Sequence, residues 1–356
     1  MTMLDNYVTF EEWLKRKYAN NLNTGNLAKS ALKSYYKFIK NENEELLLDE
    51  MRKEDPFRGA KNYTFANRLV NHMCQTLDPA TAKNYFNWIK DWWRSQGVYL
   101  EEKRLKSEVS FPKKLKENLE PLALSEIQEI ISNADQKRKA LYLTLASSGK
   151  RISELLYLRM MDVDWDSNPV SFKIRAGNTK AGQEHEGYFS SEALAAIKKI
   201  TKDKKDEDFV FHNRTLPYNV KEKIQQYCWG VAEMKYFGNL RKRIGYNKKY
   251  LTGRNTKTIH NFRSFFFTWA SLENGDGYAH AMTGHTAYLG QYFRLEKAVR
   301  IEKYLKLEPR LTIFENPKNI QKVKKLEIEN KKIEDIQREM KKYRNVMERL
   351  KKQGLV

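Results

Sequence analysis

The stretch GHTAYLGQYFR, at residues 284–294, brings together residue types that can do chemistry. On a continuous helix His285, Tyr288 and Tyr292 stand at positions i, i+3 and i+7, so they share one face. Phe293 lies about one hundred degrees further round the helix axis and has no hydroxyl group. A phenol oxygen can act as a nucleophile once it is activated, and Tyr288 is better placed for packing. Tyr292 is therefore the first candidate for a nucleophile.

Two basic residues upstream are candidates for binding an anion. Arg151 follows the turn SSGK, and Glu154 comes one helical turn later, so the two form either a surface ion pair or part of a charged site. Lys180 lies in RAGNTKAG, at the tip or edge of an expected hairpin, where a lysine commonly only keeps a strand edge soluble. Taken alone, neither residue indicates a function.

The segment TIHNFRSFFFTWAS contributes a second polar pair. His260 and Arg263 are three residues apart, so on a helix they share a face. We expect Phe262, Phe266 and Trp269 on the opposite, apolar side. This arrangement suggests a polar pair on a rigid backing, although a capping or solvent-facing pair has the same pattern.

The charge of the chain indicates a polyanionic partner. Its 356 residues carry 66 Lys and Arg against 45 Asp and Glu, a formal net charge of +21. An excess of this size favours nucleic acid over a merely charged surface, in which both signs would rise together. Nucleic acid is therefore the expected partner.

Several classes of protein are disfavoured by what the sequence lacks. Cys74 and Cys228 are too few for a disulfide framework and too far apart for a metal knuckle. The sequence has no signal-like start and no apolar run of about 18 residues, so we expect a cytoplasmic protein that does not enter a membrane. It has neither a Walker loop nor GxGxxG. We therefore expect no nucleotide, no other cofactor and no metal.

The elements that must position these residues are mostly helical. Residues 1–112 read as helices with aromatic residues at helical spacing, as in the stripe of Tyr85, Trp88, Ile89 and Trp92, which is more typical of a core than of a base-stacking platform. Residues 100–121 have the composition of a basic linker, with the domain boundary near residue 112, and the next helix is expected to start with Ser125 as its N-cap.

The rest of the chain adds a small sheet and a charged tail. Residues 138–165 read as helix, a turn at Gly149 and helix, and residues 169–191 as two short strands round a turn. From residue 326 a seven-residue repeat predicts helix–helix association, with folding back onto the body as the alternative. The expected fold is mainly α with a small β-sheet (α+β). The expected domains are 1–112, 113–315 and a coiled-coil-like helix at 316–356.

Four segments, in order, resemble sequence boxes of the tyrosine recombinase (phage integrase) superfamily, and of its archaeal integrases in particular. They are ASSGKRISELLYLRMMDVDW, IRAGNTKAGQEHEGYFSSEA, IHNFRSFFFTWA and MTGHTAYLGQYFR. The resemblance covers about residues 113–310, and residues 1–112 correspond less specifically to the family's helical core-binding domain. Any one box is weak evidence, but four in the right order are strong.

The resemblance implies double-stranded DNA as the partner, and a catalytic site for breaking and rejoining its strands without metal or ATP. Arg151 and Arg263 would clamp the non-bridging phosphate oxygens, whose charge grows in the transition state. His260 would accept the proton of Tyr292, whose reference pKa is about 10. The tyrosine would form a 3′-phosphotyrosine intermediate. Lys180 would protonate the departing 5′ oxygen, while His285 would donate to the phosphate.

The same resemblance implies an integrase of a mobile genetic element, such as an archaeal virus or plasmid, which acts as a tetramer on paired DNA sites. It leaves the nucleophile open, because the family usually places its tyrosine eight or nine residues beyond the box histidine. Eight residues beyond His285 lies Phe293, so either Tyr292 attacks or a replaced tyrosine leaves the site inactive. The alternatives are a DNA-binding protein without catalysis and a topoisomerase-like or telomere-resolving relative.

Overall fold

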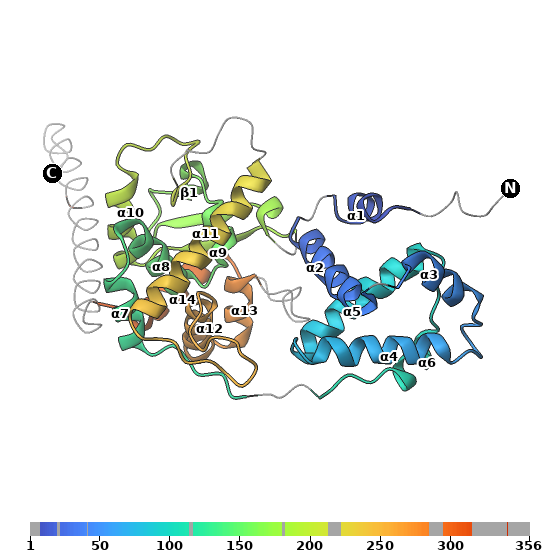
Figure 1. The fold of residues 1–356 in the computed structure, drawn as a ribbon. Coiled ribbons are helices and arrows are strands. Elements are labelled where there is room, and N and C mark those ends of the chain that lie inside the picture. The colour runs from blue at the N-terminus through green and yellow to red at the C-terminus, as the bar shows by residue number, and fades with distance from the viewer. Residues whose placement is uncertain are drawn as a thin grey trace, which may run out of the picture. The chain divides into compact units, whose positions relative to one another are not determined.

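The computed structural model describes most of the chain in two compact units (Figure 1). The described residues are 8–19, 22–40, 42–113, 117–179, 182–212, 222–284, 295–314 and 340. Unit 1 comprises residues 1–118 with 250–254, and unit 2 comprises residues 119–249 with 255–356. The expected tail helix and the stretch from His285 to Phe293 lie outside the described residues.

Unit 1 is helical wherever it forms regular structure in the described residues. Its helices are α1 (Phe10–Tyr18), α2 (Leu22–Ile39), α3 (Glu44–Lys53), α4 (Lys61–Cys74), α5 (Pro79–Ser95) and α6 (Glu102–Glu108). Asp78 begins α5: its carboxylate accepts the backbone N–H groups of Ala80 and Thr81, and Pro79 occupies the first helical position. The start of α5 therefore follows from its local sequence.

The aromatic stripe of α5 faces the core of unit 1. Ile89 and Trp92 are buried, and Tyr85 and Trp88 pack against the core while keeping some exposure. Trp93 is fully buried beside the stripe. These residues hold the helices of unit 1 together, which confirms the prediction that they form a core.

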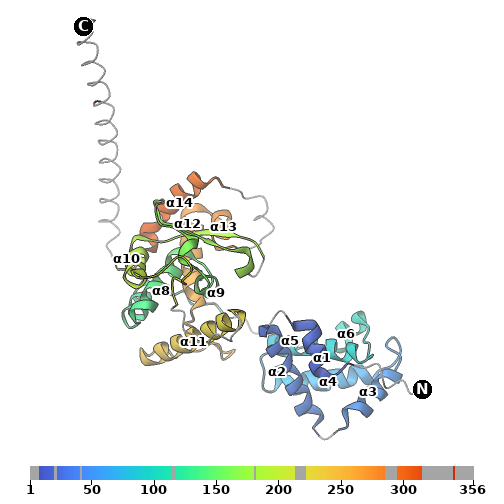
Figure 2. The ribbon, with the colours of Figure 1, turned by 90° about the horizontal axis from the view of Figure 1, so that it is seen from above.

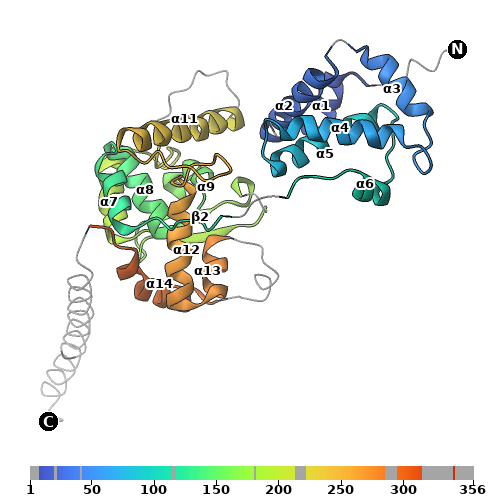
Figure 3. The same ribbon diagram turned by 60° about the horizontal axis from the view of Figure 1, so that its bottom comes forward.

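Unit 2 combines eight described α-helices with a small sheet. They are α7 (Leu124–Ser132), α8 (Gln136–Ser148), α9 (Ile152–Leu156), α10 (Ser191–Thr201), α11 (Glu222–Arg243), α12 (His260–Asn274), α13 (Asp276–Thr283) and α14 (Lys297–Leu311). Helix α8 is buried from Ala140 to Ser148 and packs against α10 and α12 (Figure 2). Helix α12 also packs against α13 and α14 (Figure 3). Helix α8 thus forms the centre of the unit.

The sheet of unit 2 is antiparallel, with the order β1 (Val163–Asp164), β2 (Ser171–Ile174) and β3 (His185–Tyr188). Strands β2 and β3 are the two expected strands, and their register pairs Ile174 with His185 at the end nearest the turn. The prediction of a mainly helical fold with a small sheet is confirmed. No described helix combines the length and apolar character that crossing a membrane requires.

One predicted helix start is wrong. Ser125 is not the N-cap of α7, since that helix begins at Leu124 and its N-cap is Ala123. The backbone N–H of Ala123 donates to Oε2 of Glu126 at 2.8 Å, so the side-chain contact at the start of α7 comes from a carboxylate in the first turn that reaches back to the N-cap residue.

Candidate catalytic site

The turn between α8 and α9 presents Arg151. Gly149 ends α8 in the left-handed region, with φ of +63°, as the sequence predicted for a turn there. A Cβ atom at Gly149 would lie 2.3 Å from the ring of Phe266, so only glycine fits. Arg151 is then the N-cap residue of α9. The turn therefore fixes the position of Arg151 at the start of α9.

Arg151 and Glu154 form a close pair that is open on one side only. Arg151 donates from Nη1 to Oε1 of Glu154 at 2.6 Å and from its backbone N–H to Oε2 at 2.8 Å. The side chain of Arg151 is 29% exposed and that of Glu154 only 1%. Burial by itself raises the pKa of Glu154, but its contacts with His185 and Arg151 outweigh burial and lower the pKa to about 2. The carboxylate is therefore ionised and holds the guanidinium in place.

Arg263, on α12, reaches the same place from a distant part of the chain. Its Nη1 donates to the carbonyl oxygen of Gly149 at 2.6 Å, and its Nη2 donates to that of Thr283 at 2.6 Å. Arg263 is 3% exposed. Burial, and next the positive charge of Arg151, lower its pKa to about 10, so it stays charged at neutral pH. The two predicted arginines therefore converge.

His260 and Arg263 are three residues apart on α12, but they differ in burial. His260 is the first residue of the helix and is exposed, whereas Arg263 is buried one turn later. The expectation for the aromatic residues needs a correction. Phe266 is not on the opposite side of the helix from Arg263, because its ring packs beneath Gly149, whose carbonyl oxygen binds Arg263. Residues three apart share a helix face, and this close approach follows from that spacing.

Four predicted site residues lie outside the described residues: Lys180, His285, Tyr292 and Phe293. The structure describes what flanks them. Strands β2 and β3 flank Lys180, and Gly284 precedes His285. Gly284 ends α13 with φ of +63°, and a Cβ atom there would lie 2.6 Å from the ring of His185. The segment that carries His285 therefore starts beside strand β3.

Lys150 and His185, which the sequence analysis did not single out, lie close to the two arginines. Lys150 is fully buried, and its Nζ donates to the carbonyl oxygens of Glu186, at 2.5 Å, and of Met282. The same nitrogen lies 3.1 Å from Nδ1 of His185. A lysine directly before Arg151 looks like one more surface cation in so basic a sequence. Its only signal is its place at the end of the otherwise uncharged stretch ALYLTLASSG.

The cluster is a positively charged site on a rigid frame. Arg151, Arg263 and Lys150 approach one another, while Glu154 and the backbone carbonyl oxygens supply the partners that such buried charges require. Across the part of the chain that the structure describes, no three His, Cys, Asp or Glu residues gather as metal ligands. The open edge of Arg151 is suited to an oxyanion such as a phosphate.

Comparison with known proteins agrees with this description. Residues 117–286 match the Phage integrase family. The chain is 32% identical over 101 residues to the tyrosine recombinase XerA of Saccharolobus solfataricus. That match covers 28% of this chain and 33% of the relative, so the chain spans about a third of the curated relative's length.

Solved structures show the same fold. A lambda integrase dimer bound to a COC′ core site superposes with a TM-score of 0.54 at 16% identity, over 82% of this chain and 78% of that one. A lambda integrase tetramer bound to a Holliday junction gives 0.53 at 16% identity, over 80% and 79%. At this level of identity the likeness concerns the fold and says nothing of individual residues.

Proposed function

Because this chain, through residues 117–286, belongs to the tyrosine recombinase (phage integrase) superfamily, we propose that it is a site-specific DNA recombinase. The observation that carries the proposal is the convergence of Arg151 and Arg263. These residues are more than one hundred positions apart, yet the Gly149 carbonyl oxygen that binds Arg263 lies two residues before Arg151. Such a pair is what a phosphodiester needs to offset its growing charge.

The two arginines have different parts in this proposal. Arg151 keeps an exposed edge, so its guanidinium meets the phosphate oxygens directly. Arg263 donates two hydrogen bonds to carbonyl oxygens and is almost fully buried, so it ties the Gly149 turn to the end of α13. Its positive charge then acts on the phosphate from below the protein surface. We assign both to the binding of one phosphate.

The reaction is a transesterification. The hydroxyl oxygen of Tyr292 attacks the phosphorus and gives its proton to His260, a bond to the tyrosine forms, and the bond to the 5′ oxygen breaks. Lys180 protonates that oxygen, and His285 donates to the phosphate. The reverse attack by a 5′ hydroxyl rejoins the strand, so the energy of the bond is kept in the phosphotyrosine.

The wider assembly follows from charge and from relatives. A net charge of +21 suits a duplex, and affinity should fall steeply with salt because phosphate contacts release counterions. We propose that residues 1–112 and the basic linker grip the DNA together with the catalytic unit. By analogy with lambda integrase on a Holliday junction, protomers pair two sites as a tetramer. The tail at 316–356 would assist self-association.

One observation favours a second candidate function. If the nucleophile belongs eight residues beyond His285, that position holds Phe293, which has no hydroxyl group. The protein would then bind DNA with the same fold and charge but would not cleave it.

A trapping experiment separates these functions. Duplexes with a randomised centre are enriched by binding to the protein, and the bound sequences are then made with a nick that prevents rejoining. A covalent adduct on a denaturing gel that Tyr292→Phe abolishes supports the recombinase. An adduct that appears only in Phe293→Tyr supports an inactive site, and bound DNA with no adduct in either protein contradicts catalysis.

A further inference from the structure

Lys150 ties together three segments that are far apart in the sequence. Its ammonium group donates to Glu186 O on β3 and to Met282 O in α13, and it faces His185 Nδ1 at 3.1 Å. The residue itself belongs to the turn that presents Arg151. A buried ammonium is costly unless its protons find acceptors, and here three protons have three acceptors.

The contact with Lys150 determines which nitrogen of His185 carries the proton. Burial, and next the positive charge of Lys150, lower the pKa of His185, so the ring is neutral near pH 7. When Lys150 donates to Nδ1, the ring proton lies on Nε2. That nitrogen is 3.7 Å from Oε1 of Glu154, an electrostatic contact longer than a hydrogen bond. The protonated side of the ring therefore faces the carboxylate that holds Arg151.

We infer that Lys150 is a positioning residue for strand cleavage. Its ammonium group holds the base of the β2–β3 hairpin and the end of α13 against the Arg151 turn, and orients His185 toward Glu154. This inference rests on the proposed function, because the three segments carry Arg151, flank Lys180 and lead into His285. Small displacements of reacting groups are expensive in rate, so a link between all three segments sets the geometry of the site.

The charge on Lys150 is balanced by its surroundings. Glu154 on α9 and Glu186 on β3 favour the ammonium form, while Arg263 on α12 and Arg151 oppose it. Burial is the largest influence, and the pKa of Lys150 falls to about 7. Above that pH the neutral amine has only two protons for three acceptors. The link between the segments should therefore weaken as the pH rises through about 7.

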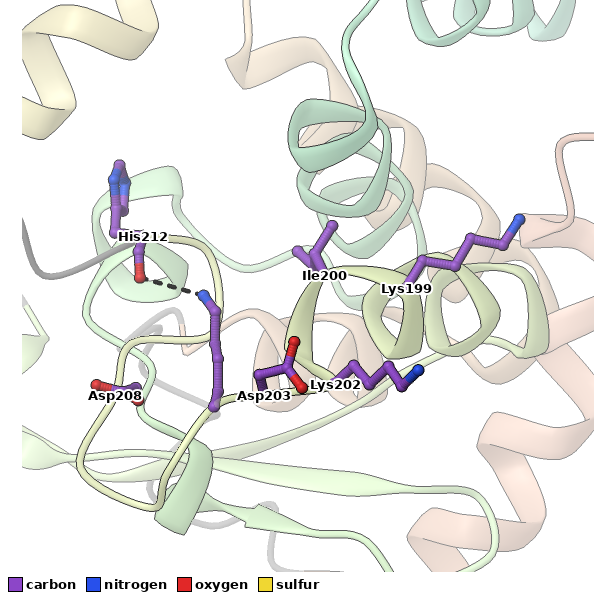
Figure 4. Close-up of a pocket in the computed structure, with 7 residues that line it drawn as sticks. Lys199, Ile200, Lys202, Asp203, Asp208 and His212 are labelled. Carbon is purple, nitrogen blue, oxygen red and sulfur yellow. Dashed lines mark hydrogen bonds between the residues drawn. The ribbon is translucent and has the colours of Figure 1, made fainter.

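The same unit contains a matched control. Lys204 donates from Nζ to the carbonyl oxygens of Phe209, Val210 and His212 at 2.7, 2.9 and 3.1 Å. The dashed line in Figure 4 marks the bond to His212. Burial lowers its pKa to about 8. Like Lys150 it is a lysine that binds several acceptors, but its acceptors all lie in one short loop after α10. Lys204→Met therefore removes similar bonds without touching the Arg151 turn.

The test compares Lys150→Met with Lys204→Met in the full-length protein. DNA affinity is measured by gel shift, and the rate of adduct formation is measured at saturating nicked duplex between pH 6 and 9. We expect Lys150→Met to bind DNA within about threefold of wild type but to form adduct at least about tenfold more slowly at pH 6.5. The deficit should shrink above pH 7, and Lys204→Met should match wild type throughout. Equal rates for Lys150→Met and wild type across this range would overturn the inference.

A second readout does not depend on cleavage. In protein with ¹⁵N-labelled histidine, the His185 signals, assigned by their loss in His185→Gln, should show unprotonated Nδ1 and change with a midpoint near pH 7. That midpoint should vanish in Lys150→Met. Signals in the wild type that do not change near pH 7 refute the link even if Lys150→Met fails to fold. If no substrate gives an adduct while the midpoint is present, the proposed function fails and the link stands.

Discussion

In unit 1 the buried side chains are mostly aromatic and aliphatic, with Asn62 and Gln96 as buried polar residues of its described part. Every described Asp, Glu, Lys and Arg residue of that unit keeps some exposure, whereas unit 2 buries many charges. The buried charged residues described in unit 2 are Lys150, Glu154, Glu192, Glu233, Arg241, Lys257, Arg263 and Glu308. A buried charge is costly unless it is paired. Unit 2 must therefore supply hydrogen-bond or ion-pair partners for these buried charges.

Some of these charges serve the fold alone. Glu308 accepts the backbone N–H and the hydroxyl of Ser191 at the start of α10, and Glu192 accepts the backbone N–H groups of Ile313 and Phe314 after α14. These carboxylates satisfy backbone N–H groups at the start of α10 and just after α14. Burial of charge is thus no sign of function by itself. What distinguishes Lys150, Glu154 and Arg263 is that they meet at one open guanidinium.

The largest expected effect tests whether that meeting point is catalytic. Arg263→Ala and Arg151→Ala should each reduce adduct formation by about 10³-fold or more, because each removes positive charge from the transition state. DNA affinity should stay near that of wild type, since many other phosphate contacts remain. Single-turnover rates at saturating nicked duplex and gel-shift titrations measure the two quantities.

The contrast between the two units would not hold if Arg151→Ala and Arg263→Ala lost DNA binding in step with DNA cleavage. A loss of both would mean that the arginines only support the fold of unit 2, as Glu192 and Glu308 do. Thermal unfolding of each variant, run beside the rate measurement, separates a folded but inactive protein from an unfolded one.

The sequence predicted the parts of the site that rest on local pattern. The turn at Gly149, the strands round Lys180 and the placement of Arg263 on a helix follow from glycine, β-branched and aromatic residues, and helical spacing. The convergence of Arg151 and Arg263 was anticipated only through the resemblance to a family. No spacing rule connects residues so far apart.

The rest depends on tertiary packing. Lys150 looks like an ordinary cation in the sequence, and only the packing of β3 and α13 against its turn buries it. Phe266 was assigned to the wrong side of α12, because apolar residues cover more than one face of that helix. Propensity favours Ser125 as the N-cap of α7, but the helix begins one residue earlier and the side-chain contact at its start comes from the carboxylate of Glu126.

A smaller effect should appear in acid. The pKa of Glu154 falls from 4.5 to about 2 in the folded protein, so the carboxylate stabilises the fold at any pH above about 4.5. That contribution, about 3 kcal/mol at most, is lost as the pH falls from 4.5 toward 2. In urea unfolding, wild type should lose about 2 kcal/mol more than Glu154→Gln between pH 5 and pH 3. Identical pH profiles would show that the Arg151–Glu154 pair does not persist in solution.

The smallest expected effect concerns a carboxylate of unit 1. Glu102 accepts from Lys90 at 2.8 Å and lies 3.5 Å from Arg94, but its side chain is 52% exposed. Water and salt screen such a pair, so Glu102→Gln should change the free energy of unfolding by less than about 1 kcal/mol. Urea unfolding at low and at high salt measures the change, which should disappear at high salt. If Glu102→Gln lowered the free energy of unfolding by as much as the roughly 3 kcal/mol assigned to Glu154, unit 1 would depend on its charges as unit 2 does. A small loss would place the need for paired charge in the unit that holds Arg151.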